Sequence, residues 1–408
     1  MNQQSSLEFS KSLVFALISL GALLILPSPL QAQEGNSGTW DASVRYRLEL
    51  VDDDRLSEDA EASTARLRLG YRSAESSGFS FRVQGEGVVH VGPDYFNDTR
   101  NGETQFPVVA DPDGFNLNEA YVQYRNDSHR VTVGRRAINL DNQRFIGSVA
   151  WRQNEQTYDS AVWEFTGLDD STFTYGYIDQ VNRIFGPDSG TPTDEFDSES
   201  HLLNFNTGLG FGRLSAYAYL LEFDNAAALS TQTYGLRLAG ALADNDQYRF
   251  GYQLEFAAQS DYQNNPIDYD ANYYLAELNA AQGVWSGALG MEVLEGDNGS
   301  AGPRGFVTPL ATLHKFQGFA DLFLVTPGFG VVDQYIKAQY RQDRLGLTLA
   351  YHRFESDRGS LDLGTEIDLT ASYGLGEWGS LLFKYARFNA DEFARDRSIF
   401  WFQYAYNF

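Results

Sequence analysis

Arginine side chains at alternating positions are the first chemical feature of this sequence. Arg45 and Arg47 lie two residues apart, as do Arg66 and Arg68, and Arg82 follows a little further along the chain. The guanidinium group is planar and permanently charged, and it can donate two parallel hydrogen bonds to one carboxylate. The chain has 26 Arg and only 4 Lys, so most of its cations have this geometry. These residues therefore predict the recognition of carboxylates.

Catalytic chemistry has much weaker support in the sequence. A hydrolase needs a nucleophile–base pair or an acid–base dyad, and the five His residues belong to no recognisable catalytic motif. They are His90, His129, His201, His314 and His352. The sequence also lacks Cys, a His/Cys spacing typical of a metal site and a glycine-rich phosphate loop. We therefore expect no enzymatic activity and no cofactor.

The elements that position the arginines are predicted to be β-strands. From residue 40 to residue 50, apolar side chains alternate with polar ones, and Arg45 and Arg47 are among the polar ones. Neighbouring side chains of a strand point to opposite faces. The alternation thus predicts a strand with one apolar and one polar face. The stretches 65–72 and 79–86 show the same pattern, which places all five arginines on the polar face.

The same rhythm continues to the end of the chain. Further strands are predicted at 117–125, 129–136, 158–166, 171–181, 200–209, 213–223, 232–242, 248–259, 271–281, 285–295, 331–341, 345–354, 364–373, 379–388 and 397–408. Short connections alternate with long ones, and strands of about ten residues suit a membrane-spanning barrel. We therefore predict an all-β fold, a transmembrane antiparallel β-barrel of about 18 strands with short periplasmic turns and long extracellular loops.

The last strand, 397–408, is aromatic on one face. The aromatic residues at every second position are Phe400, Phe402, Tyr404, Tyr406 and Phe408. A sandwich edge strand would need a core to cover this face, whereas a strand that closes a barrel can expose it to lipid. An even number of strands would place both termini at the short-turn end.

The N-terminus and the charge of the chain indicate export. Lys11, the apolar run Leu13–Leu26 and the small residue Ala32 predict a signal peptide over residues 1–32, cleaved near Ala32, with the barrel over 33–408. The expected location is the outer membrane of a Gram-negative cell, in contact with the bilayer and lipopolysaccharide. A net charge of −25 argues against nucleic acid as a partner. The acidic outer loops are expected to be solvated or to bind divalent cations at the lipopolysaccharide surface.

A long apolar stretch, Pro303–Gly330, interrupts the strand pattern on the outer side. Leu310, Leu313, Phe316 and Phe319 follow a nearly helical spacing. A strand here would make the count odd, so we predict a folded loop that could include a short helix. It would form a constriction or lid in the mouth of the barrel, or alternatively pack on its rim.

Three further stretches carry a resemblance to a known family. Gly134–Gly147, Trp151–Asp159 and Thr308–Asp321, together with the last strand, resemble the alginate export family of outer-membrane porins. The resemblance implies an 18-stranded barrel whose arginine-rich lumen conducts an anionic polyuronate. The sequence departs from the family in lacking a long periplasmic turn that could plug the inner mouth.

The resemblance also implies roles for individual arginines. Arg135, Arg144 and Arg152 would line the entrance of the lumen. Arg135 shares the strand face of Val131 and Val133, however, so parity favours Arg136 as the inward residue.

Together these features predict a water-filled channel, because a barrel of 16–18 strands leaves an aqueous lumen. The cations expected to line the path of an anion are Arg45, Arg47, Arg66, Arg68, Arg82, Arg135, Arg136, Arg144, Arg152, Arg237, Arg249 and Lys337. The expected substrate is an alginate-like polysaccharide or oligosaccharide, and periplasmic export components are possible partners. Three alternatives stay open: uptake of acidic sugars or small organic anions, a lumen whose charges only pair with each other, and a closed structural barrel.

Overall fold

The computed structural model describes residues 38–187, 192–245, 247–297 and 304–408. The predicted signal peptide and its cleavage near Ala32 lie outside these residues. Within the described ranges, no helix has the length and apolarity needed to span a membrane.

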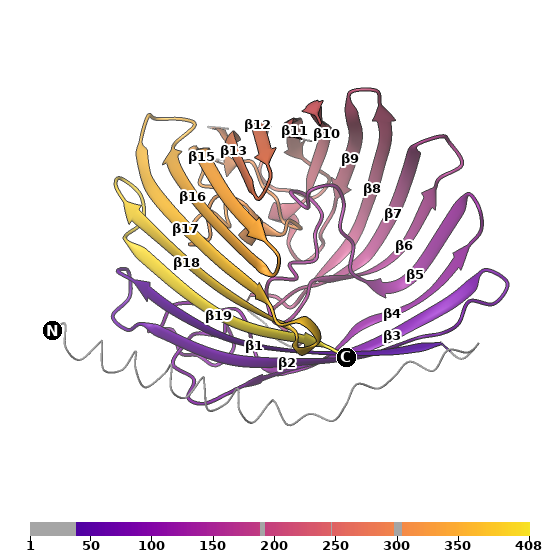
Figure 1. Cartoon of the computed structure of the whole chain (residues 1–408), viewed down its shortest axis with the longest axis horizontal. Coiled ribbons are helices and arrows are strands. Elements are labelled where there is room, and N and C mark those ends of the chain that lie inside the picture. Colours follow the sequence, from indigo (N-terminus) through magenta and orange to yellow (C-terminus); the bar gives the residue numbers. More distant parts are fainter. Residues whose placement is uncertain (1–37, 188–191, 246, 298–303) are drawn as a thin grey trace.

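The fold is a closed antiparallel β-barrel, as predicted (Figure 1). Of the nineteen strands in the described residues, β14 (Arg304–Gly305) is a two-residue strand on a loop, and the other eighteen form the wall. These are β1 (Thr39–Asp53), β2 (Ala60–Arg72), β3 (Phe79–His90), β4 (Gly114–Arg125), β5 (His129–Arg136), β6 (Thr157–Phe165), β7 (Ser171–Asn182), β8 (Glu195–Leu209), β9 (Gly212–Leu221), β10 (Thr231–Asp244), β11 (Arg249–Asp261), β12 (Asp270–Gln282), β13 (Trp285–Asp297), β15 (Gly330–Gln342), β16 (Leu345–Glu355), β17 (Asp362–Gly374), β18 (Ser380–Ala390) and β19 (Arg397–Asn407). Each pairs with its neighbour in sequence, and β19 pairs with β1 to close the ring.

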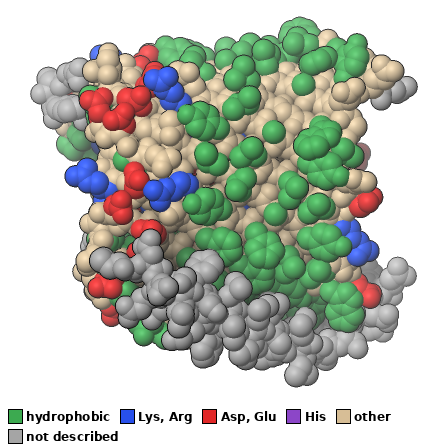
Figure 2. All heavy atoms as spheres, turned by 60° about the vertical axis from the view of Figure 1, so that its left-hand side comes forward, with side chains coloured by type: hydrophobic (Ala, Val, Ile, Leu, Met, Phe, Trp, Pro, Cys, Tyr) green, Lys and Arg blue, Asp and Glu red, His purple; other side chains and the backbone are tan. Residues whose placement is uncertain are grey.

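Side-chain parity follows the alternation seen in the sequence. On β2, Leu67 and Leu69 are 54 % and 51 % exposed on the outside, whereas Arg66, which precedes Leu67, is only 8 % exposed. On β19, Trp401 is fully buried inside, and Phe400 and Phe402 belong to the opposite face. Figure 2 shows that hydrophobic side chains cover much of the visible wall, with charged groups nearer its margins. The outer surface therefore suits contact with lipid.

Three long loops, all at the same end of the barrel, fold into its interior. We refer to them as the 91–113, 137–156 and 306–329 loops. Each contributes fully buried apolar residues, such as Phe96, Ile146 and Leu310, and Ile146 forms a parallel β-bridge with Leu310. The apolar residues gather in two clusters. One lies mainly against β6 to β13 and the other against β1, β2 and β15 to β19. The interior is thus partly packed like a soluble protein core.

The 306–329 loop confirms one prediction and refines another. It contains no wall strand, and its only helical element is the single 3-10 turn Leu313–Lys315. Three Pro and four Gly interrupt the apolar spacing from residue 303 to residue 330, and proline or glycine disfavours a longer helix. The first strand extends to Asp53, further than predicted, and this carboxylate is buried and paired with Arg55 instead of solvated.

Candidate functional site

Three of the predicted arginines hold the 137–156 loop against the wall. Arg45 donates from Nε to Gln153 Oε1 at 2.9 Å and from another nitrogen to the Ala150 carbonyl at 2.9 Å. Arg66 donates to the Gln153 carbonyl at 3.4 Å. Arg47 donates to the Trp151 carbonyl and lies 4.0 Å from the centre of that indole ring. Because their donors face this loop, these buried guanidinium groups position the loop inside the lumen.

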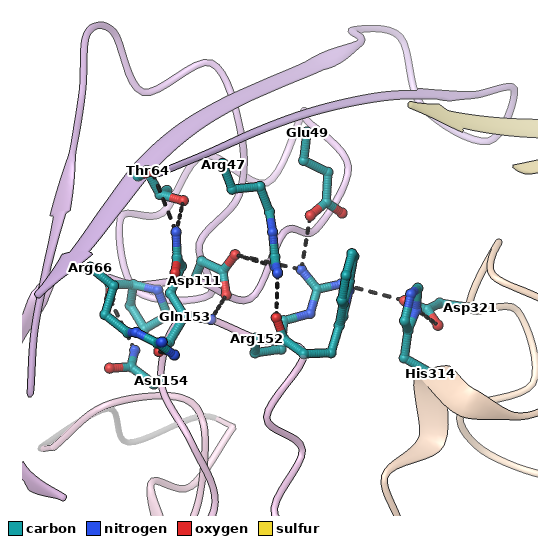
Figure 3. Close-up of polar contacts among 12 residues, drawn as sticks. Arg47, Glu49, Thr64, Arg66, Asp111, Arg152, Gln153, Asn154, His314 and Asp321 are labelled. Atoms are coloured by element: carbon teal, nitrogen blue, oxygen red, sulfur yellow. Dashed lines mark hydrogen bonds and ion pairs between the residues drawn. The ribbon is translucent and has the colours of Figure 1, made fainter. Parts of the chain in front are cut away.

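Asp111, from the 91–113 loop, lies at the centre of this arrangement (Figure 3). Its side chain is completely buried. One oxygen lies 3.4 Å from Arg47 and 3.9 Å from Arg152, and the other accepts the Gln153 backbone N–H at 2.7 Å. One carboxylate therefore joins the wall and two of the inward loops.

Arg152 extends the network to the third inward loop. It pairs with Glu49 of β1 at 3.2 Å and with Asp321 of the 306–329 loop at 3.4 Å, as Figure 3 shows. Burial alone would lower the pKa of Arg152, but Glu49, Asp111 and Asp321 raise it above its ordinary value. Arg152 thus remains a cation that three carboxylates hold in place.

Arg68 and Arg82 lie on the same wall and keep a partly exposed side chain. Arg68 pairs with Glu86 at 2.5 Å and with Glu155 of the 137–156 loop at 2.9 Å. Arg82 pairs with Asp41 at 2.6 Å and also with Glu119. The predicted cluster on β1 to β3 therefore exists. In this structure its arginines pair with carboxylates of the protein itself.

A second part of the wall, from β11 to β17, is acidic and holds the 306–329 loop. Glu366 of β17 accepts the Ala320 backbone N–H at 2.8 Å, and Asp368 accepts that of Phe319 at 3.2 Å. Carboxylates on β11 to β17 thus satisfy loop donors, just as arginines on β1 to β3 satisfy loop carbonyls. The lumen has a basic side and an acidic side, and the folded loops lie between them.

Arg144 joins the two loops through the acidic wall. Its Nε lies 2.9 Å from Glu292 of β13, and it donates to Gln317 of the 306–329 loop at 3.2 Å. Its guanidinium also lies 4.6 Å from the centre of the Phe316 ring. Arg144 is 1 % exposed, so its role in this structure is to fix loops.

His314 connects the 306–329 loop to the wall through a chain of hydrogen bonds. Its Nδ1 lies 2.8 Å from Asp321, and its Nε2 lies 2.6 Å from the Lys384 ammonium of β18. Lysine can only donate, so Nε2 accepts and Nδ1 donates to the carboxylate. Burial lowers the pKa of His314 to about 3, which agrees with a neutral ring. The ring also stacks on Trp151 at 4.4 Å.

Strand parity favoured Arg136 as the inward residue, and Arg136 pairs across the ladder with the fully buried Tyr158, whereas Arg135 pairs with Asp159. Strand β5 pairs with β4 only from Ala120 onward, so the loop-side part of β4 has no described partner on that side. Arg135 spans this gap: it donates to Asp159 of β6 at 2.7 Å and to the Leu117 carbonyl at 3.5 Å. The Arg136 guanidinium lies 5.9 Å from the Tyr121 ring.

The remaining predicted residues are dispersed. Arg237 donates to Gln253 at 2.6 Å and lies 3.7 Å from Glu255, whereas Arg249 is exposed at the short-turn end of β11. Lys337 is half-buried on β15. Of the predicted constriction residues, Leu310 is fully buried inside the barrel, and Leu313, Phe316 and Phe319 are half-buried on the same inward loop.

One group of described residues could ligate a metal at the loop end. His90, Asp98 and Asp113 each offer one ligand atom, and these atoms lie within 4.8 Å of one another. His90 Nδ1 is hydrogen-bonded to Asp94 at 2.8 Å, so Nε2 is the nitrogen directed at the group. Oxygen and imidazole ligands suit several divalent cations.

Comparison with protein families identifies the chain. A family model described as alginate export matches residues 39–275, which is more than half of the sequence. The chain belongs to the alginate export family. A comparison with curated proteins found no match.

Solved structures show where this member of the alginate export family lies among known folds. It is similar to OccAB4 of Acinetobacter baumannii, with a TM-score of 0.70, 14 % identity, and coverage of 93 % of this chain and 100 % of that chain. It is also similar to OpdL of Pseudomonas aeruginosa, with a TM-score of 0.68, 16 % identity, and coverage of 91 % and 98 %. Family and fold together identify an outer-membrane channel of the porin type.

Several residues of this alginate export family site were not predicted from the sequence. Asp111 lies in a stretch that reads as an outer loop, and Asp321 and His314 lie within a stretch used only for its resemblance and apolar spacing. The sequence does contain one signal that the loop carrying Asp111 is buried. The 91–113 loop carries Phe96 and Val109, apolar residues that a solvated loop would not need, and both are fully buried.

Proposed function

We propose that this channel is anion-selective and carries acidic carbohydrate, polyuronate chains or fragments of them, across the outer membrane. The observation that carries the proposal is the arginine wall on β1 to β3. Arg68 and Arg82 keep 14 % and 11 % of their side chains exposed and already hold carboxylates at 2.5 to 2.9 Å. A passing carboxylate could replace Glu155 on Arg68, because the two acceptors are chemically equivalent.

Transport by exchange follows from this geometry. A charge-assisted hydrogen bond contributes about 1.5–3 kcal/mol when dry and less in a wet pore. Each site would therefore bind an anion and release it to the next one. The same proposal assigns lipid and lipopolysaccharide contacts to the apolar wall, a divalent cation to the group around His90, and periplasmic export components to the short-turn end.

A second candidate is the uptake of small organic anions. The three inward loops favour it, because they pack inside the barrel and occupy part of the lumen. Among the structural neighbours, OpdK of Pseudomonas aeruginosa was solved with vanillate, at 13 % identity and a TM-score of 0.68. Vanillate is a small aromatic carboxylate.

Ion selectivity in planar bilayers tests the proposal. Under a KCl gradient we expect a reversal potential that favours chloride, and we expect block of the current by uronate oligomers. Arg68→Ala and Arg82→Ala should each reduce both effects. Arg125→Ala is the matched control, because the Arg125 side chain is 55 % exposed and its one ion pair among the described residues is with Glu75. Cation preference of the unmodified protein in low salt would contradict the proposal.

Oligomer length separates the two candidates. A carrier of polyuronate should be blocked more strongly as the oligomer becomes longer, since a longer chain meets more sites. The current through a carrier of small anions should be blocked most strongly by the uronate monomer.

A further inference from the structure

A small cavity lies beside the 306–329 loop on the acidic side of the lumen. It has a volume of about 180 Å³ and is enclosed by the 306–329 loop and by residues of β11, β12, β13, β15 and β16. Its charged lining consists of three carboxylates and two ammonium groups, besides His352. These are Glu277, Glu292, Asp333, Lys315 and Lys337. The sign of the charge that the cavity offers to a ligand depends on which of these groups are already paired.

All three carboxylates are held by donors of the protein. The contacts are Tyr335 Oη to Glu277 at 2.8 Å, Arg144 Nε to Glu292 at 2.9 Å and His352 Nδ1 to Asp333 at 2.9 Å. Glu292 also accepts the Tyr273 hydroxyl at 2.6 Å. Each of the three carboxylates therefore already accepts a hydrogen bond from a protein donor.

The two ammonium groups have no such partner. Lys315 Nζ donates to the Asn142 carbonyl at 3.1 Å, and Lys337 Nζ lies 4.1 Å from the centre of the Tyr335 ring. Among the residues that the structure describes, neither lysine forms an ion pair with a carboxylate. An ammonium group has three donors, so both lysines retain donors for a ligand.

The size and the ring surfaces of the cavity limit the ligand. Its volume of about 180 Å³ suits one sugar ring or one small aromatic acid. Phe316 and Tyr335 contribute ring surface to the lining, and Gln253 contributes an amide. Such a lining combines apolar contact with a few fixed polar groups, as ligand sites generally do.

We propose that this cavity binds a single small carboxylate, a uronic acid monomer or a small organic acid, through Lys315 and Lys337. The inference rests on the proposed anion conduction and deepens it by favouring a monomeric substrate. One lysine lies on the wall and the other on the inward loop, so an anion between them would contact both.

Current block by D-glucuronate, with neutral D-glucose as the comparison probe, tests this inference. We expect D-glucuronate to block the channel and D-glucose to leave the current unchanged. Lys315→Gln and Lys337→Gln should each raise the half-blocking concentration about tenfold, the effect of losing one charge-assisted hydrogen bond in a wet site. Lys337→Arg should retain most of the block because it retains the charge.

Arg341→Gln provides the matched control. Arg341 lies on the same face of β15 as Lys337, is exposed, and is not part of the cavity lining. Its removal deletes one positive charge from the lumen and should change the block less than twofold. Variants are compared only where they show the heat-dependent gel migration of the unmodified barrel.

The outcomes separate this inference from the proposed function. Unchanged glucuronate block in folded Lys315→Gln and Lys337→Gln channels that still prefer anions would overturn the cavity assignment alone. Equal block by D-glucose would overturn it as well. Cation preference of the unmodified channel would instead overturn the proposed function on which it rests.

Discussion

At the scale of single residues, the interior is organised by charges that each hold more than one element. Asp111 contacts Arg47 from the wall and Arg152 and Gln153 from a loop, and it is completely buried. A buried ion pair adds little net stability compared with an apolar pair, but removal of one partner leaves an uncompensated charge. Asp111 should therefore be much less tolerant of substitution than the exposed acids of the same loop.

The substitution Asp111→Asn tests this dependence. It keeps the shape of the side chain and removes the charge beside Arg47 and Arg152. We expect a loss of about 3 kcal/mol, seen as a lower temperature of the heat-dependent gel shift, together with larger and noisier single-channel currents. Glu103→Gln is the control, because Glu103 lies half-buried on the same loop and accepts a hydrogen bond from the exposed Gln105. Equal stability of the two variants would contradict a central role for Asp111.

Acidification should loosen the 306–329 loop through His314. Burial lowers the pKa of His314 to about 3 in the folded protein, whereas a released histidine has a pKa of about 6.5. The released loop therefore binds a proton that the packed loop excludes. Packing should weaken by up to about 1.4 kcal/mol per pH unit below pH 6.5.

Protonation of Asp321 should weaken the packing of the 306–329 loop further at lower pH. Burial alone would raise its pKa, but His314 and Arg152 lower it to about 2, so its stabilising charge is lost below about pH 4. We expect more frequent conductance transitions at pH 4.5 than at pH 7.5. His314→Gln should remove most of this difference. An equal frequency of conductance transitions at both pH values in the wild-type channel would show that protonation does not loosen the loop.

At the scale of elements, two loops meet at a point that accepts only glycine. A Cβ on Gly147 would lie 2.2 Å from Thr312 Oγ1 and 3.0 Å from Gln143 Cβ. The Gly147 backbone N–H also donates to the Leu310 carbonyl at 2.8 Å. The 137–156 and 306–329 loops can thus approach closely only because this position has no side chain.

Gly147→Ala should separate the two loops. Overpacking of this kind costs about 1–3 kcal/mol, and we expect larger conductance with an unchanged barrel wall. Adding Thr312→Ala removes the clashing hydroxyl and should restore part of the wild-type conductance. Single-channel recording of the single and double variants measures this directly, and a double variant that conducts like Gly147→Ala alone would refute the contact as the cause.

At the scale of the whole molecule, closure of the barrel determines resistance to unfolding. Pairing of β19 with β1 leaves no free edge in the ring, apart from the unpaired part of β4. In lipid, an unpaired backbone group costs several kcal/mol, so a closed barrel unfolds only as a unit. Detergent-solubilised protein should therefore be rich in β-structure, and boiled and unboiled samples should migrate differently on a gel. Helix-dominated circular dichroism would contradict this fold.

The sequence by itself determined the wall of the barrel. Period-two alternation is a local property, so each strand and its inward face can be read without knowledge of its neighbours. The predicted 129–136 strand matches β5 residue for residue. On β2, Arg66 faces inward whereas Leu67 and Leu69 face outward, as the pattern required. The aromatic face of the last strand is the other clear example.

Only the tertiary structure decided what fills the lumen. The sequence places Arg45, Arg47 and Arg66 on the inner face, but it does not say that the backbone carbonyls of residues 150–153 occupy their donors. Asp111 reaches Arg47 from 64 positions away along the chain. Contacts of that kind depend on how loops fold back between strands, and no local periodicity encodes that path.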